Sequence, residues 1–250
     1  MRNKIVFASD FHLGIDSKNT SKDRELLIVE WLLSLRSEMK ELYLVGDIFD
    51  YWFEYKSSIP KGYSDFMNAL RLLRNDGIKI TFFTGNHDMW MFDYFTEEFG
   101  IEVLKKPQVF EFYGAKFFVA HGDGLGPGDH VYKIVKKIFS NRICQALFSL
   151  IHPSLALRMM RSISQRDAGK YTKPDTFKDE EEWLIQFANQ YQQREEMVDF
   201  FIFGHRHLMY EYDLKKHGKV VNLGDWISFL SYAVWDGEKL DLLQYKKNGI

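Results

Sequence analysis

The feature that most constrains the fold is an alternation of short apolar runs with longer amphipathic segments in the first half of the chain. The apolar runs are KIVFAS, ELYLV and KITFF, and helices are expected between them at about residues 23–37 and 63–75. Strands that alternate with helices are typical of βαβ units and a mostly parallel sheet. The sequence therefore predicts an α/β protein.

The second half of the chain adds further strands around a helical stretch. VFEFYGAKFFVA predicts a hairpin that turns at Tyr113-Gly114, and five short apolar runs follow from about residue 199. Residues 130–195 between these strands have a helical pattern. We expect one domain over residues 1–250, in which a helical insertion at about 130–195 forms a cap on the strand scaffold.

Composition excludes several classes of protein. A chain of 250 residues with 46% hydrophobic residues can bury a large core, and its net charge of -2 gives no global reason to expect nucleic acid as a partner. No run of eighteen apolar residues is present, and the N-terminus enters a strand without a secretory leader. The single cysteine, Cys144, lies in apolar helical sequence, where we expect it in the core of a cytoplasmic protein.

The predicted cap has a one-sided charge. Residues 130–170 contain eight Lys or Arg but one acidic residue, Asp167, together with the apolar run ICQALFSLIHPSLAL. One interpretation is an ordinary helical cap with solvated cations. The other is a groove for acyl chains with a cationic rim, which would favour anionic lipid surfaces and phosphates.

Five of the apolar runs end in residues that can bind metals. Those residues are Asp10 and His12, Asp47, Asn86 with His87, His121, and finally His205 with His207. Each set alone is common in turns, but the carboxyl ends of parallel strands share one crevice, where the sets can converge. The two-residue period of a strand would place Asp10 and His12 on the same side, and the same reasoning applies to His205 and His207.

This donor set indicates hard or borderline divalent cations. Carboxylate, imidazole and amide donors without thiolates suit Mn²⁺, Mg²⁺, Fe²⁺ or Zn²⁺. Seven or eight ligands are too many for one ion, so we expect two ions that share a bridging carboxylate. Two such ions about 3.5–4 Å apart clamp a phosphoryl group and lower the pKa of a bound water. Nearby Asp88, Asp123 and Asp225 are expected to orient the histidines or to close turns.

In their order, D-x-H, G-D, G-N-H-D, H-G-D and G-H-x-H, these sets resemble the pattern of the calcineurin-like metallophosphoesterases. The resemblance implies a two-sheet β-sandwich that is flanked by helices. It also implies that the protein binds two divalent ions, for which Mn²⁺ is the leading candidate. It also implies a role for each residue. Asp10, His12 and His207 would hold one ion, Asn86, His121 and His205 the other, Asp47 would bridge them, and His87 would face the substrate phosphate as a catalytic residue beside Asp47.

Within that family the chain resembles the UDP-2,3-diacylglucosamine pyrophosphatases of lipid A biosynthesis. The supporting segments are GDIFDYW at residues 46–52, LGDW at 223–226, and the long insertion. The resemblance implies hydrolysis of the lipid nucleotide to UMP and 2,3-diacylglucosamine 1-phosphate at the cytoplasmic face of the inner membrane. It implies substrate contacts from His87, Asp129, Arg161, Ser164 and Lys170.

One position departs from the pyrophosphatase pattern. Those enzymes usually have Arg after the metal-binding Asn, whereas this chain has His87. Another phosphodiester or nucleotide is therefore an alternative substrate. A nuclease that uses the basic insertion, or a scaffold without turnover, are alternatives from other classes, although the complete ligand set argues against the scaffold.

Overall fold

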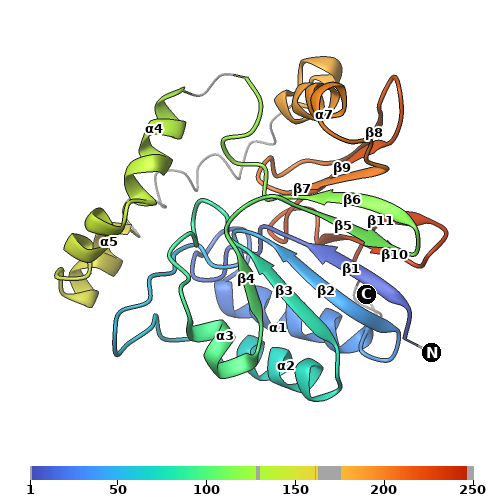
Figure 1. Ribbon diagram of the computed structural model, residues 1–250. Coiled ribbons are helices and arrows are strands. Elements are labelled where there is room, and N and C mark those ends of the chain that lie inside the picture. The colour runs from blue at the N-terminus through green and yellow to red at the C-terminus, as the bar shows by residue number, and fades with distance from the viewer. Residues whose placement is uncertain (1, 128–129, 161, 163–175, 247–250) are drawn as a thin grey trace.

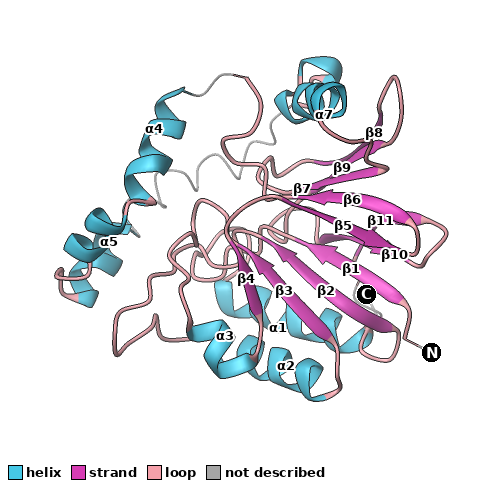
Figure 2. Cartoon of the chain, viewed as in Figure 1, coloured by secondary structure: helices cyan, strands magenta, loops and turns pink. Residues whose placement is uncertain are grey.

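The computed structural model describes residues 2–127, 130–160, 162 and 176–246. Two mixed β-sheets pack face to face and helices cover both outer faces, so the predicted two-sheet α/β sandwich is confirmed (Figure 2). The predicted ligands lie where loops from both sheets meet.

The first sheet is built mainly from the N-terminal half of the chain. In sheet order its strands are β11 (Leu240–Gln244), β10 (Ser231–Trp235), β1 (Lys4–Ala8), β2 (Met39–Val45), β3 (Lys79–Phe83) and β4 (Glu102–Leu104). The strands β1 to β4 are parallel, as the βαβ pattern predicts, and β10 and β11 are antiparallel additions. The helices on its outer face are α1 (Ser21–Ser34), α2 (Ser64–Asn75) and α3 (Tyr94–Phe99).

The second sheet contains the strands of the C-terminal half and the predicted hairpin. In order they are β5 (Gln108–Phe112), β6 (Ala115–Val119), β7 (Phe200–Phe203), β9 (Lys219–Leu223) and β8 (Met209–Asp213). Its three central strands are parallel. The hairpin between β5 and β6 turns at Tyr113 and Gly114, whose φ angles of 54° and 87° are those of a primed two-residue turn.

Alternate residues of β1 show how the layers are held together. Ile5 and Phe7 lie in the core between the sheets, while Val6 and Ala8 lie in the core under the first three helices. The ring of Phe7 stacks on Tyr43 at 5.3 Å and on Phe117 of the second sheet at 5.8 Å. Full burial of each such side chain contributes roughly 1.5–3 kcal/mol. Strands buried on both faces explain why the sequence shows continuous apolar runs here.

The segment predicted as an insertion contains two unlike parts. Helix α7 (Trp183–Arg194), which follows a 3₁₀ turn at Asp179–Glu181, packs on the outer face of the second sheet through Leu184, Ile185 and Ala188. Helices α4 (His130–Phe139) and α5 (Arg142–Phe148) and the helix Pro153–Met160 lie to one side of the sandwich (Figure 1). We call these last three helices the cap.

Trp90 anchors the cap to the scaffold. Its indole Nε1 donates to the carbonyl of Phe139 at 2.8 Å, and its ring lies 4.7 Å from that of Phe148. None of the α5 residues is buried, so the expectation that Cys144 is a core residue is wrong. Among the described residues no single helix is long and apolar enough to cross a membrane, although α5 and the helix Pro153–Met160 together reach that length across a 112° bend.

Candidate metal centre

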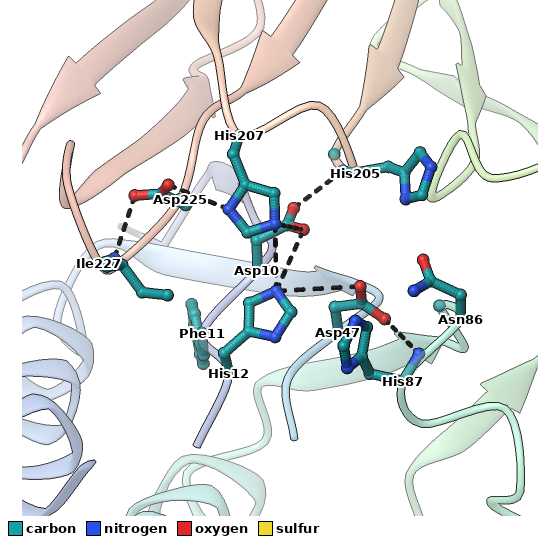
Figure 3. A network of polar contacts seen from close by, with 12 residues as sticks. Asp10, Phe11, His12, Asp47, Asn86, His87, His205, His207, Asp225 and Ile227 are labelled. Carbon is teal, nitrogen blue, oxygen red and sulfur yellow. Dashed lines mark hydrogen bonds and ion pairs between the residues drawn. The ribbon is translucent and has the colours of Figure 1, made fainter. Parts of the chain in front are cut away.

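Loops from five strands bring the predicted ligands to one place. Side chains that follow β1, β2, β3 and β7 gather around a common centre (Figure 3), and His121 after β6 joins them there. The crevice therefore lies between two sheets rather than at the edge of one.

Asp10, His12 and His207 form the first candidate group. Nε2 of His207 lies 3.3 Å from Oδ1 of Asp10 and 3.2 Å from Nε2 of His12. Nε2 of His12 is 3.7 Å from the same carboxylate oxygen. Three donor atoms thus surround one small volume.

Asp47, Asn86, His121 and His205 form the second group. Nε2 of His121 lies 3.2 Å from Oδ2 of Asp47 and 3.3 Å from Oδ1 of Asn86. A nitrogen of His205 lies within 4.8 Å of donor atoms of Asp47 and His121. Because Oδ2 of Asp47 is also 3.9 Å from Nε2 of His12, this carboxylate lies between the two groups. The arrangement can hold two cations side by side, the geometry of a phosphoryl clamp.

The backbone that presents these ligands is not strand. The strands β1 and β7 end at Ala8 and Phe203, and Asp10, His12, His205 and His207 have φ angles of 56°, 45°, 66° and 49°. The prediction that a strand period aligns each pair is therefore wrong. Hydrogen bonds between loops impose the left-handed conformation instead: Asp10 N–H donates to Gly46 O, and His12 N–H donates to Asp47 O. Such conformations are unfavourable for non-glycine residues and gather at functional sites.

His87 lies beside the two groups and is less buried than His12 or His121. Its side chain is 17% exposed, against 0% for His12 and 1% for His121. Its Nδ1 lies 2.9 Å from the carbonyl of Asp50, and its backbone N–H donates to Oδ1 of Asp47. Nδ1–H donation to a carbonyl leaves Nε2 for a ligand. Asp50 was not among the predicted site residues, although it stands three residues after Asp47 in GDIFD.

Two of the candidate ligand histidines, His207 and His121, have a hydrogen-bond acceptor at Nδ1 that fixes their tautomer. Nδ1 of His207 lies 3.0 Å from Oδ2 of Asp225, and Nδ1 of His121 lies 2.9 Å from the carbonyl of Val45. Each acceptor holds the proton on Nδ1, so the Nε2 lone pair faces the centre, as metal-ligating histidines require. Asp225 therefore orients a histidine as expected. Asp88 closes a turn through the N–H of Gly85 and also joins the loop after β3 to the loop after β2, since its carboxylate accepts the N–H of Ile48.

The donors fit divalent ions. Oδ1 of Asp10 is buried and directed at the centre, with the ring nitrogens Nε2 of His207 and His12 at 3.3 and 3.7 Å from it. A Cβ atom at Gly204 would lie 2.5 Å from Oδ2 of Asp10, which shows how closely the backbone approaches the ligands. A buried carboxylate is costly unless positive charge compensates it, and a divalent cation held by these donors would supply that charge.

The titration behaviour of the centre also indicates a need for positive charge. Burial by itself lowers the pKa of His12, but the carboxylates of Asp10 and Asp50 outweigh it and raise the pKa to about 10. His121 behaves alike: Asp47 overcomes the effect of burial and raises its pKa to about 10. Burial raises the pKa of Asp47, yet His121 and its neighbours hold that pKa well below the ordinary value. In the metal-free chain, protons on His12 and His121 therefore balance the charge of the buried carboxylates.

From these shifts we expect Mn²⁺ affinity to rise with pH. The pKa values of His12 and His121 are about 10, so at lower pH both imidazoles are protonated in the metal-free chain. Each must lose one proton before its nitrogen can bind a metal. Burial lowers the pKa of His205 to about 4, so this ligand is already neutral near pH 7. Calorimetric titration with Mn²⁺ at two pH values about one unit apart, in buffers of different ionisation enthalpy, measures the released protons. Equal affinities without proton release would contradict the assignment.

Arg24 is a second residue that sequence analysis missed. It is 2% exposed on α1, and its guanidinium donates to the carbonyls of Phe11, His12 and Ile15 at 2.8, 2.6 and 2.6 Å. These bonds hold the loop that carries His12. A helical Arg gives no signal in the sequence that its side chain points inward.

Replacing Arg24 by Met is expected to lower the stability by about 3 kcal/mol, because three buried carbonyls lose a charged donor. For a domain of this size the melting temperature should fall by roughly 6–12 °C. Arg36→Met is the control, since Arg36 is 42% exposed in its pair with Asp76 and its replacement should lower the melting temperature far less. Equal melting temperatures for the two variants would refute the role of Arg24.

The predicted substrate contacts Asp129, Arg161, Ser164 and Lys170 lie outside the described residues. Two described residues of α4 do reach the centre. The hydroxyl of Tyr132 donates to Oδ2 of Asp123 at 2.5 Å, and Nζ of Lys136 lies 2.6 Å from the same oxygen. The cap is thus tied to the loop that carries His121.

Comparisons with known proteins point to one family. A family profile described as Calcineurin-like phosphoesterase matches residues 3–209. The UDP-2,3-diacylglucosamine hydrolase of Porphyromonas gingivalis is 39% identical, with 97% of each chain covered. The protein of that name in Photorhabdus laumondii is 27% identical over 96% of this chain and 98% of its own. The zinc complex of Vps29 from Entamoeba histolytica has a TM-score of 0.45 at 13% identity, covering 96% of this chain and 89% of that one.

Proposed function

This chain belongs to the calcineurin-like phosphoesterase family, and we propose that it hydrolyses the pyrophosphate of UDP-2,3-diacylglucosamine to UMP and 2,3-diacylglucosamine 1-phosphate. The observation that carries the chemistry is the pair of ligand groups on either side of Asp47. Similarity to the Porphyromonas hydrolase over nearly the whole of both chains supports this substrate.

Family membership implies divalent metal ions. We assign Asp10, His12 and His207 to one ion and Asn86, His121 and His205 to the other, with Asp47 shared, and we propose Mn²⁺ as the metal. When bound, such ions supply Lewis acidity to the phosphoryl oxygens and lower the pKa of a water molecule. Hydrolysis would join the oxygen of a water molecule to one phosphorus and release the bridging oxygen with the electron pair of the broken bond, and the proton lost by the water would pass to solvent or to a product phosphate.

The residue assigned to substrate charge is His87. Its Nδ1 contact with Asp50 O directs Nε2 away from Asp50, where it can bond a phosphoryl oxygen. The leaving group is itself a phosphate monoester, whose second pKa is about 6, so its departure needs little protonation near neutral pH. Stabilisation of developing negative charge is therefore the main task of the imidazole.

A cavity beside the centre offers room for the rest of the substrate. It has a volume of 470 Å³ and lies between the scaffold loops and the cap helix Pro153–Met160. Asp50, which contacts His87, is part of its lining. Lys61 from the scaffold and Arg158 from the cap add positive charge to the walls, and Tyr51 and Leu157 add apolar surface. A sugar with acyl chains and phosphates suits this mixture.

A substrate comparison tests the proposal. The protein is stripped of metal, reloaded with Mn²⁺, and offered UDP-2,3-diacylglucosamine in detergent, a generic phosphodiester and single-stranded DNA. Release of UMP from the lipid nucleotide, with slow turnover of the other two, is the expected result. Rapid hydrolysis of the generic ester beside an inert lipid nucleotide would overturn the substrate and favour another phosphodiester.

Contact of the cap with a membrane surface belongs to the same proposal. Ile143 and Leu147 of α5 and Leu150 just after it are 70%, 62% and 81% exposed, and the basic residues Lys137 and Arg142 lie in α4 and at the start of α5. Exposed apolar side chains beside cations are typical of proteins that lie on anionic lipid surfaces. The lipid substrate itself resides in such a surface, so we place the protein at the cytoplasmic face of the inner membrane.

Vesicle flotation tests this contact. The wild type should float with vesicles of phosphatidylcholine and phosphatidylglycerol, and the variant I143E/L150E should not. Leu26→Glu is the matched control, because Leu26 is 48% exposed on α1, which covers the first sheet away from the cap. Flotation of both variants at the wild-type level would refute a membrane role for the cap.

A further inference from the structure

The loop after β7 presents two candidate ligands in an unfavourable backbone conformation. His205 and His207 have φ angles of 66° and 49°, and Arg206 stands between them. A left-handed conformation is unfavourable for non-glycine residues, so surrounding contacts must hold this loop in place. On one side, Nδ2 of Asn222 donates to the carbonyl of Gly204 at 2.8 Å.

On the other side, the Arg206 side chain grips the start of α7. Nε and Nη2 of Arg206 donate to the two carboxylate oxygens of Glu182, each at 3.0 Å. The two side chains are 10% and 1% exposed. The guanidinium carbon also lies 4.7 Å from the ring centre of Trp183. A bidentate pair with one stacked face fixes the position and the plane of the guanidinium.

The location of the Arg206–Glu182 pair beside the candidate metal ligands indicates a role other than stabilising the fold. Burial of two charges costs about as much as their attraction returns, so such a pair is weak support for overall stability. The pair instead fixes the position of Arg206. This residue stands between His207 of the first ligand group and His205 of the second. The ring of Trp183 lies 6.1 Å from that of His205, so the same contact also borders the second group directly.

We propose that Arg206 is a positioning residue for the metal centre, which acts through its bidentate pair with Glu182 to keep His205 and His207 in their ligating conformations. The inference rests on the proposed function only in that it concerns the same two metal groups. Arg206 touches neither metal nor substrate in this role. Without it, both His205 and His207 would gain conformational freedom and leave their ligating positions.

Mn²⁺ binding to the purified full chain provides the test. In Arg206→Met, calorimetry should show Mn²⁺ affinity at least about tenfold weaker than in the wild type, the range found when partners of metal ligands are removed. We expect kcat for the lipid nucleotide to fall with it, because the ligands are misplaced. Arg206→Lys, which keeps the charge but bonds one oxygen at a time, should recover part of the affinity. Glu182→Gln, which keeps the shape of the pair and removes one charge, should weaken binding less than Arg206→Met.

The matched control is Arg74→Met. Arg74 is also partly buried and donates to the carbonyls of Phe99 and Ile78, but it lies on α2 of the other sheet. This variant should lose melting temperature without losing Mn²⁺ affinity. Wild-type Mn²⁺ affinity in both Arg206→Met and Glu182→Gln would overturn the proposal, whatever their melting temperatures. A wild type that binds Mn²⁺ but leaves the lipid nucleotide intact would instead refute the substrate, while the affinities would still decide the role of Arg206.

Discussion

Replacing Asp47 by Asn is expected to lower kcat by at least about 10³-fold, which corresponds to roughly 4 kcal/mol of transition-state stabilisation. Asp47 is the carboxylate that lies between the two groups: its Oδ2 is 3.2 Å from Nε2 of His121 and 3.9 Å from Nε2 of His12. An amide at this position keeps the shape of the side chain but removes the charge that two cations share. We therefore expect the variant to bind fewer Mn²⁺ ions per chain.

Asparagine is the informative replacement because of the backbone. Asp47 has a φ of 52°, a conformation that Asn adopts more readily than Ala, so the loop after β2 should keep its shape. The Asn oxygen can still accept the His87 N–H that now bonds Oδ1. Steady-state kinetics and metal analysis of the same preparation give the result. Asp76 caps the C-terminus of α2 and pairs with Arg2 and Arg36, so the control Asp76→Asn should leave kcat and Mn²⁺ content unchanged.

Activity and metal content at wild-type levels in Asp47→Asn would refute the shared ligand. Loss of kcat with two Mn²⁺ ions still bound would also count against it, because the carboxylate would then act on the substrate and not as a ligand. Only the joint loss of turnover and metal supports a bridging role.

The second large effect concerns His87. Replacing it by Gln or Ala should lower kcat by about 10²- to 10³-fold, the usual cost of removing one group that stabilises charge in the transition state. Mn²⁺ affinity should stay at the wild-type value, because His87 is assigned to the substrate and its ring nitrogen bonds Asp50 O. Kinetics with the lipid nucleotide, paired with calorimetry, separate the two quantities.

The substitution His87→Arg distinguishes two roles for the imidazole, stabilisation of charge and proton transfer. Arg carries the charge permanently and cannot give up a proton in a protein, so it can stabilise phosphate but cannot act as a general acid. If charge stabilisation is the task, His87→Arg should keep kcat within about tenfold of the wild type. A loss as large as that of the Gln variant would show that proton transfer from His87 is required.

The predictable part of this protein was carried by local patterns. Apolar runs of strand length predicted β1, β2, β3, β6 and β7, because strands buried on both faces must be apolar throughout. A polar set after each run predicted the candidate ligands, because a ligand and the strand that positions it are neighbours in the chain. Asp10 and His207 could be paired in advance only through the resemblance of the whole pattern to a family, since 197 positions separate them.

Helix α7 illustrates where local pattern fails. Its residues have the same amphipathic character as a cap helix, and we placed them in the insertion at 130–195. Leu184, Ile185 and Ala188 are nevertheless fully buried on the second sheet. Periodicity reveals that a helix has an apolar face, but the partner of that face is determined by the packing of distant strands.

The sequence by itself determined which donor atoms the centre contains, because motif residues are contiguous with the strands that carry them. Only the tertiary structure decided how those atoms are aimed. The left-handed backbone at Asp10 and His205, and the contacts of Arg24 with Phe11 O and of Arg206 with Glu182, join segments distant in the chain. Such bonds form when two separately folded loops are brought together by the sandwich, and no local pattern encodes them.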